Sequence, residues 1–187
     1  MKTSFLLLVV TLVAMTTFAS AATTDCNFDN FTGSGTVPDG YCNITWNGVW
    51  TYYDSVQPPY NAHTPPERVF APNTGAGQYD FSFSSPQVFQ GAWFAGYSFA
   101  TVTFNLYDAS NNLVWTSASL DPSATPTWLP SGYSGLVETV GVFSLANDFY
   151  VMDDVTYGTA VPEPATLGLL ATGAIGALGM VRRRFAK

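Results

Sequence analysis

The chain has 187 residues and a formal net charge of −7. Between residues 22 and 161 a single cation, Arg68, stands against twelve acidic residues, which gives this segment a net charge of −11. Such a charge disfavours binding to nucleic acid or to an anionic lipid surface. The segment of about 140 residues is long enough for one domain with a sizeable core.

The first 21 residues have the layout of a secretory signal peptide. Lys2 supplies a basic start, residues 5–15 are apolar, and small residues continue through Ala21 and Ala22. We expect signal peptidase to cut after Ala21 or Ala22. A permanent membrane span is disfavoured because the apolar run is too short and is followed by an Ala-x-Ala site.

Cys26 and Cys42 are the only cysteines, and both follow the predicted signal peptide. In an oxidising compartment this pair predicts a disulfide that closes a short loop at the amino end of the domain. A metal site built on the pair is disfavoured, because there is no third thiol and His63 is the sole histidine. Asn30 and Asn43 also open N-glycosylation motifs.

Residues 22–160 are predicted to form an all-β sandwich or barrel. Short aromatic, Val and Thr runs recur between Gly, Pro, Asn and Ser clusters, and no helical period of useful length appears. The clearest hairpin joins residues 99–107 to 113–116, with Val102, Phe104 and Leu106 on one face. Further strands are expected at residues 41–46, 49–53, 79–83, 88–94, 136–143 and 149–157.

The order of landmarks resembles the jelly-roll sandwiches of secreted carbohydrate-binding modules. A Phe28-Asp29 pair stands near the start of the domain, and the last expected strand carries Asp153-Asp154. The resemblance implies an antiparallel jelly-roll-like β-sandwich. In similar modules an ion ties the last strand to the first segment.

Asp153 and Asp154 lie where the apolar phase of the last strand shifts by one residue, which predicts a β-bulge and a carboxylate at a sheet rim. Calcium takes six to eight oxygen ligands, so Asp29 and Asp154 are candidate ligands, with Asp153 as a substitute. The alternative is a pair of solvated edge carboxylates. No other cofactor is expected.

Two groups of aromatic residues allow either sugar stacking or core packing. The first comprises Trp46, Trp50, Tyr52, Tyr53 and Tyr60, and the second Trp93, Phe94 and Tyr97. Core packing is the more common fate of such residues.

Nothing in the sequence favours catalysis, and we expect that the protein is not an enzyme. His63 lies in a turn-rich loop without a Gly-x-Ser-x-Gly elbow. A carboxylate pair could serve a glycosidase, but any acidic domain offers such pairs.

Residues 161–187 combine three features of a sorting tail. Pro162-Glu163-Pro164 precedes an uncharged apolar stretch at about residues 165–181, which is followed by Arg182, Arg183 and Arg184. The stretch is near the lower length limit of a transmembrane helix, and the arginines predict a cytoplasmic end. The order of these features resembles the PEP-CTERM sorting signal of Gram-negative bacteria.

The PEP-CTERM resemblance implies that exosortase, a membrane transpeptidase-like enzyme, recognises the Pro-Glu-Pro tripeptide and cuts near it. It further implies an association with exopolysaccharide. We therefore expect an exported structural or adhesive protein, anchored in the inner membrane with its domain on the periplasmic side and then moved to the cell surface or matrix. The alternatives are a lectin-like module that binds exopolysaccharide and, less favoured, a hydrolase.

Overall fold

Strands make up nearly all of the regular structure in the computed structural model, which describes residues 22–159. The predicted signal peptide (1–21), the sorting tail (161–187) and its expected helix (165–181) lie outside the described residues. Within residues 22–159, no helix is long and apolar enough to cross a membrane. The strands of this part are β1 (Thr23–Cys26), β2 (Ser34–Thr36), β3 (Ile44–Thr45), β4 (Thr51–Tyr53), β5 (Arg68–Phe70), β6 (Gly75–Gly96), β7 (Val102–Tyr107), β8 (Leu113–Thr116), β9 (Thr127–Pro130), β10 (Val137–Asn147) and β11 (Tyr150–Gly158), with one short 3-10 turn at Tyr41–Asn43.

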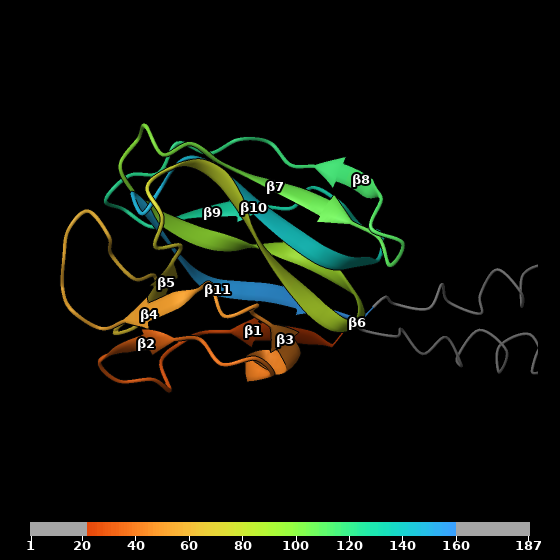
Figure 1. Cartoon of the computed structure of the whole chain (residues 1–187), viewed down its shortest axis with the longest axis horizontal. Coiled ribbons are helices and arrows are strands. Elements are labelled where there is room, and N and C mark those ends of the chain that lie inside the picture. The colour runs from red at the N-terminus through yellow and green to blue at the C-terminus, as the bar shows by residue number, and fades with distance from the viewer. Residues whose placement is uncertain (1–21, 160–187) are drawn as a thin grey trace, which may run out of the picture. The chain divides into compact units, whose positions relative to one another are not determined.

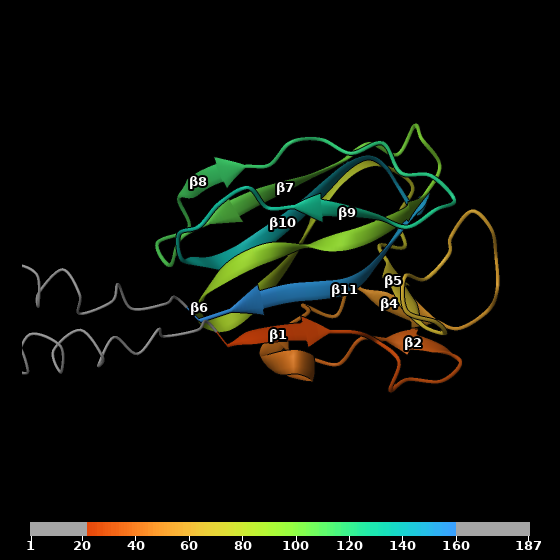
Figure 2. The same cartoon turned by 180° about the vertical axis from the view of Figure 1, so that it is seen from behind.

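The strands form antiparallel sheets in the order β2-β4-β5-β11-β6-β10-β7-β8. In addition β1 pairs with β11, while β3 and β9 pair with β6. Figures 1 and 2 show the resulting two layers, with β7, β8 and β10 in one and β1, β4, β5 and β11 in the other. The predicted all-β sandwich is confirmed.

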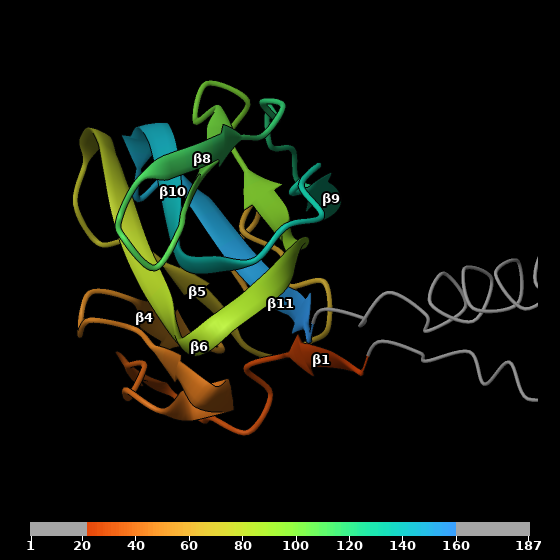
Figure 3. The ribbon, with the colours of Figure 1, turned by 90° about the vertical axis from the view of Figure 1, so that its right-hand side faces the viewer.

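Strand β6 belongs to both layers. Its first half pairs with β10, and its second half, from Val88 to Gly96, pairs with β11. Figure 3 shows the strand as a V whose bend joins the two layers. The register against β10 shifts between Ser82 and Gln87, a segment that includes the exposed Pro86. Because proline cannot donate a ladder hydrogen bond, such a break in the pairing suits it.

The core between the layers is rich in aromatic side chains. Val102, Phe104 and Leu106 of β7 are fully buried, as the predicted alternation requires. Phe104 packs edge-on against Phe89, with ring centroids 4.8 Å apart, and so links β7 to β6. Burying side chains of this size stabilises a fold by a few kcal/mol each.

The amino end of the domain is fastened by a disulfide and by a tryptophan. Cys26 and Cys42 are bonded, with Cα atoms 5.8 Å apart, which confirms the predicted pairing. Trp46 is fully buried, and its backbone N–H donates to Asp39 Oδ1 at 2.6 Å. Because β1 pairs with β11, this fastened segment is tied directly to the last strand.

Several predicted strand limits differ from the structure. The segments expected at residues 79–83 and 88–94 are parts of the single strand β6. The strand continues through its bend because its first half pairs with β10 and its second half with β11. Residues 41–43 form a 3-10 turn rather than the start of a strand. β1, β2, β5 and β9 have no counterpart in the prediction, because each has at most four residues and no clear alternation.

Candidate functional site

The predicted bulge in the last strand is present. The register between β11 and β6 shifts between Asp153 and Thr156 and again beside Tyr157. Asp154 has a φ of 47°, in the left-handed region where Asp is tolerated better than most residues. The bulge therefore turns the two neighbouring carboxylates of Asp153 and Asp154 toward the loop between β4 and β5.

Asp153 holds backbone amides rather than facing solvent. Its Oδ2 accepts from the N–H groups of His63 at 2.8 Å and Thr64 at 3.0 Å, and its Oδ1 accepts from the N–H of Asp154 at 2.9 Å. Asp153 thus fixes residues 63 and 64 against β11.

Asp154 binds the side chains of the same two loop residues. Its Oδ2 lies 2.5 Å from His63 Nδ1, and its Oδ1 accepts from the Thr64 hydroxyl at 2.8 Å. The imidazole in turn stacks on the Trp93 ring, with centroids 3.6 Å apart and planes 7° apart. The His63 ring is therefore held on one face by an aromatic ring and at one nitrogen by a carboxylate.

The alternative of solvated edge carboxylates is wrong for Asp153 and Asp154. Each is only 2% exposed, because the β4–β5 loop folds over the bulge and supplies hydrogen-bond donors to both. The sequence predicts a carboxylate at a sheet rim, whereas the structure buries both carboxylates. The loop residues are separated from their partners by about 90 positions, so local sequence patterns contain no sign of the contact.

Asp29 lies close enough to this pair for the charge of Asp154 to act on its carboxylate. Burial and, next, the charge of Asp154 raise the pKa of Asp29, while the backbone of Glu67 and the side chain of Thr64 oppose that rise. Its Oδ1 is buried without a hydrogen-bond partner within residues 22–159. Asp29 and Asp154 are therefore brought together with an acceptor oxygen left over.

Glu67 is a buried acidic residue that the sequence reasoning missed. It is fully buried, and neither of its carboxylate oxygens has a partner among the described residues. Burial raises the pKa of Glu67, with smaller contributions from the charges of Asp54 and Asp29. No pattern in the surrounding Pro-Pro-Glu-Arg segment predicts this burial.

The hydrogen-bond donors around Asp153 and Asp154 balance the negative charge of these carboxylates only in part. Burial, followed by the charge of Asp154, raises the pKa of Asp153 to about 8, against the lowering effect of its three backbone donors. Burial and the charge of Asp154 also raise the pKa of Asp25, which accepts from Thr156 Oγ1 at 3.2 Å. Acidic groups crowded in this way gain stability when protons or cations neutralise them.

The carboxylates fit a calcium ion only in part. Within residues 22–159, no group of three or more His, Cys, Asp and Glu side chains is arranged to hold a metal ion. Asp153 is a poor substitute ligand, because its oxygens accept from three amides. The unpartnered oxygen of Asp29 fits a cation, whose remaining ligands would have to include backbone carbonyl oxygens.

The aromatic residues divide between core and surface. Trp46, Trp50 and Phe94 are fully buried, so core packing explains them. Tyr52, Tyr53, Tyr60 and Trp93 are half-buried, and Tyr97 is 43% exposed. Any aromatic contact with a ligand therefore depends on the tyrosines and Trp93 rather than on the first two tryptophans.

The predicted sorting signal is confirmed by comparison with known families. Residues 160–184 match the family model described as the PEP-CTERM protein-sorting motif. Pro162, Glu163, Pro164, Arg182, Arg183 and Arg184 all fall inside the match and outside the described residues. The chain therefore carries a PEP-CTERM sorting motif directly after its β-sandwich. No curated protein matches the chain significantly.

Solved structures resemble the domain only distantly. A family 29 carbohydrate-binding module has 12% identity and a TM-score of 0.44, over 75% of this chain and 94% of its own. A DUF4465 family protein from Bacteroides caccae has 12% identity and a TM-score of 0.43, over 77% and 94%. A TmCBM61 complex with β-1,4-galactotriose has 11% identity and a TM-score of 0.33, over 79% and 92%. At these scores the likenesses assign no ligand to this chain.

Proposed function

We propose that the chain is an exported structural or adhesive protein whose β-sandwich is displayed at the cell surface or in the extracellular matrix. The match of residues 160–184 to the PEP-CTERM motif carries this proposal. By this proposal exosortase recognises Pro162-Glu163-Pro164, the apolar stretch anchors the chain in the inner membrane, and Arg182 to Arg184 stay cytoplasmic. Signal peptidase removes residues 1–21, and exopolysaccharide is the expected companion.

The domain itself agrees with export. Its cysteines form a disulfide, a bond that persists in oxidising compartments and is rare in the cytosol. Its net charge of −11 between residues 22 and 161 also disfavours binding to nucleic acid. That the protein is not an enzyme stays a prediction.

Localisation of tail variants tests the proposal. In a host with an exosortase, the wild-type chain should reach the outer surface or the medium, where added protease degrades it in intact cells. Glu163→Ala should leave the chain in the inner-membrane fraction, because the recognition tripeptide is broken. Glu138→Ala, a change within the sandwich, is the matched control and should behave as wild type. Equal surface delivery of the Glu163 variant would overturn the proposed role of the tripeptide.

We propose in addition that a structural calcium ion binds beside Asp29 and Asp154. The unpartnered Asp29 oxygen and the uncompensated charge around it support this proposal. Binding would stabilise the folded state by about 2.7 kcal/mol when calcium stands at 100 times its dissociation constant. The ion would add a link between the segment after β1 and the last strand.

Thermal unfolding in calcium, in magnesium and in chelator tests the ion. Calcium alone should raise Tm by several degrees, and Asp29→Asn should remove that difference. Asp29 is a better target than Asp154, because Asp154 also holds His63 and Thr64. Equal Tm values in calcium and chelator would end the calcium proposal.

A further inference from the structure

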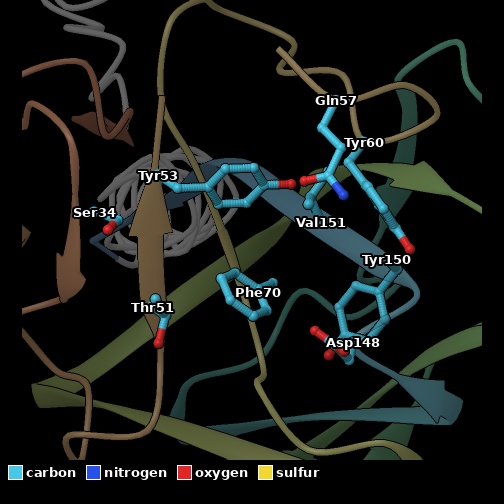
Figure 4. Close-up of a pocket in the computed structure, with 9 residues that line it drawn as sticks. All are labelled: Ser34, Thr51, Tyr53, Gln57, Tyr60, Phe70, Asp148, Tyr150 and Val151. Atoms are coloured by element: carbon cyan, nitrogen blue, oxygen red, sulfur yellow. The ribbon is translucent and has the colours of Figure 1, made fainter. Parts of the chain in front are cut away.

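A pocket of about 300 Å³ opens at one end of the sandwich, beside the β4–β5 loop. Its size lies at the lower end of the range of small-molecule sites. Figure 4 shows its lining, with Tyr53 and Gln57 directed toward each other on one side and Asp148 and Tyr150 on another. The lining residues are Ser34, Thr51, Tyr53, Gln57, Tyr60, Phe70, Asp148, Tyr150 and Val151.

Two neighbouring side chains hold the Tyr53 ring of the pocket in place. The Arg68 guanidinium lies 4.0 Å from the centroid of the Tyr53 ring. Phe70 meets the same ring edge-on, with centroids 5.3 Å apart. Arg68 also donates to the carbonyl oxygens of Pro66 and Ser55. Its charge is therefore compensated by backbone acceptors. A ring fixed in this way loses little freedom when a ligand packs against it.

The polar lining offers hydrogen-bond partners that the protein itself leaves free. Burial alone raises the pKa of Asp148, with no hydrogen bond from residues 22–159 opposing the rise. Burial, and then the nearby charges of Tyr97, Asp148 and Tyr53, raise the pKa of the Tyr60 hydroxyl. No hydrogen bond from residues 22–159 offsets this rise. The Gln57 amide adds both a donor and acceptors.

Among residues 22–159, no lysine, arginine or histidine lines the pocket. A phosphate, sulfate or uronate would meet the Asp148 carboxylate without a cation to balance it, and would be repelled. A purely apolar ligand would cover the polar groups of the lining without pairing them, at a cost for each. The lining therefore suits an uncharged molecule with both hydroxyl groups and apolar faces.

We propose that this pocket binds a neutral saccharide, with a ring packed against Tyr53 or Tyr60 and hydroxyl groups donating to Asp148. Such a site would give the domain a ligand whether or not the sorting motif is processed. Of the first aromatic group named in the sequence, Tyr53 and Tyr60 line the pocket, whereas Trp46 and Trp50 are buried in the core.

An exposed aromatic strip extends from the pocket. Tyr60 meets Tyr97 edge-on at 5.7 Å, and Tyr97 stacks with Phe99 at 5.4 Å between centroids. Tyr97 is 43% and Phe99 is 54% exposed. Adjacent exposed rings of this kind can carry further sugar units of a polymer, because each offers an apolar face. The ligand class is therefore narrowed to a polysaccharide, with one sugar unit in the pocket.

The pocket lies at the opposite end of β11 from Gly158, which is near the last described residues. Asp148 and Tyr150 stand at the start of β11, whereas Gly158 at its other end pairs with Thr23. The strand of nine residues is roughly 30 Å long at about 3.3 Å per residue. Figure 1 shows the β4–β5 loop and the ends of the described chain on opposite sides.

Affinity electrophoresis of the full chain in mild detergent tests the proposal. Gels contain one soluble polysaccharide each: neutral β-glucan, galactomannan, xylan or galactan, and polygalacturonate as the anionic comparison. At least one neutral polymer should retard the wild-type chain, and polygalacturonate should not. Asp148→Asn should weaken binding at least about tenfold, because a charged acceptor is lost. Asn also tolerates the positive φ of 68° at this position.

Two matched variants separate the site from the rest of the surface. Asp121→Asn removes a carboxylate that accepts from Thr101 and should leave binding unchanged. Trp115→Ala removes an exposed ring from β8 and should also have no effect, whereas Tyr60→Ala should weaken binding. Because burial disfavours the ionised Asp148, the Asp148→Asn chain should melt at the wild-type Tm or above it, so lost binding would not reflect unfolding. Failure of every neutral polymer to bind, or binding unaffected by Asp148→Asn and Tyr60→Ala, would overturn the inference.

Discussion

Loss of the Cys26–Cys42 disulfide should cost the domain a large share of its stability. The bond closes a loop with a sequence separation of 16. For a loop of this length the chain-entropy relation gives about 3 kcal/mol at 25 °C. Whole domains are typically stable by only about 5–15 kcal/mol. For a unit of about 140 residues, about 3 kcal/mol corresponds to a Tm decrease of roughly 10 °C.

The assay is thermal unfolding of the purified protein with and without reductant. Wild type should melt roughly 10 °C lower after reduction. The Cys26→Ala/Cys42→Ala double variant should melt near the reduced wild type and should not respond to reductant. Because Cys26 is fully buried, its replacement adds a small cavity term, so the double variant should be the less stable of the two.

A reduced protein that melts within a degree or two of the oxidised form would refute the reasoning. It would mean that the hydrogen bonds and aromatic contacts of residues 26–46 already fix this segment in the absence of the bond. A Tm decrease of roughly 10 °C would instead explain why the domain suits an oxidising compartment. In a reducing cytosol the domain would lose the disulfide and much of its free energy of unfolding.

Three further predictions concern buried polar groups. In chelator, Tm should fall as pH rises from about 4 to about 8, because Asp153 binds its proton more tightly in the folded state than in the unfolded chain. A Tm that stays constant or rises over this range at constant ionic strength would contradict this. Asp153→Ala should lower the free energy of unfolding by at least about 3 kcal/mol, because it leaves three N–H groups unpaired. Asp153→Asn keeps one acceptor and should lower the free energy of unfolding by less. Equal losses for the two variants in denaturant unfolding would contradict this role of Asp153. Tyr150→Phe should raise the free energy of unfolding by about 1 kcal/mol, because the Tyr150 hydroxyl is buried without a partner among residues 22–159. Tyr157→Phe, which loses a hydrogen bond to the Cys42 carbonyl, should lower it. A destabilised Tyr150→Phe chain would contradict the first expectation.

Local patterns were enough to predict the strands with the clearest alternation. The β7–β8 hairpin follows from alternation over residues 101–107 and a turn-rich link. The bulge at Asp153 follows from the phase shift of apolar residues along one strand. Both features depend on neighbours in the sequence, which is why the sequence alone reveals them.

Long-range contacts could not be predicted in the same way. The join of two expected strands into β6 depends on pairing with β10 and β11 at once. The burial of Asp153 and Asp154 depends on a loop about 90 residues away. The burial of Glu67 and the pocket beside Asp148 likewise arise from the packing of distant segments.

The intact mass of the mature protein tests the central claim most directly. Protein recovered from the surface or medium of a host with an exosortase should begin near Ala22 and end near Pro162 to Pro164, without the Arg182 to Lys187 segment. The same chain from a host that lacks the exosortase should keep that segment and stay in the membrane fraction. If most of the exported protein in the first host still carries Arg182 to Lys187, the tail is not processed at the motif, and the account of sorting is contradicted.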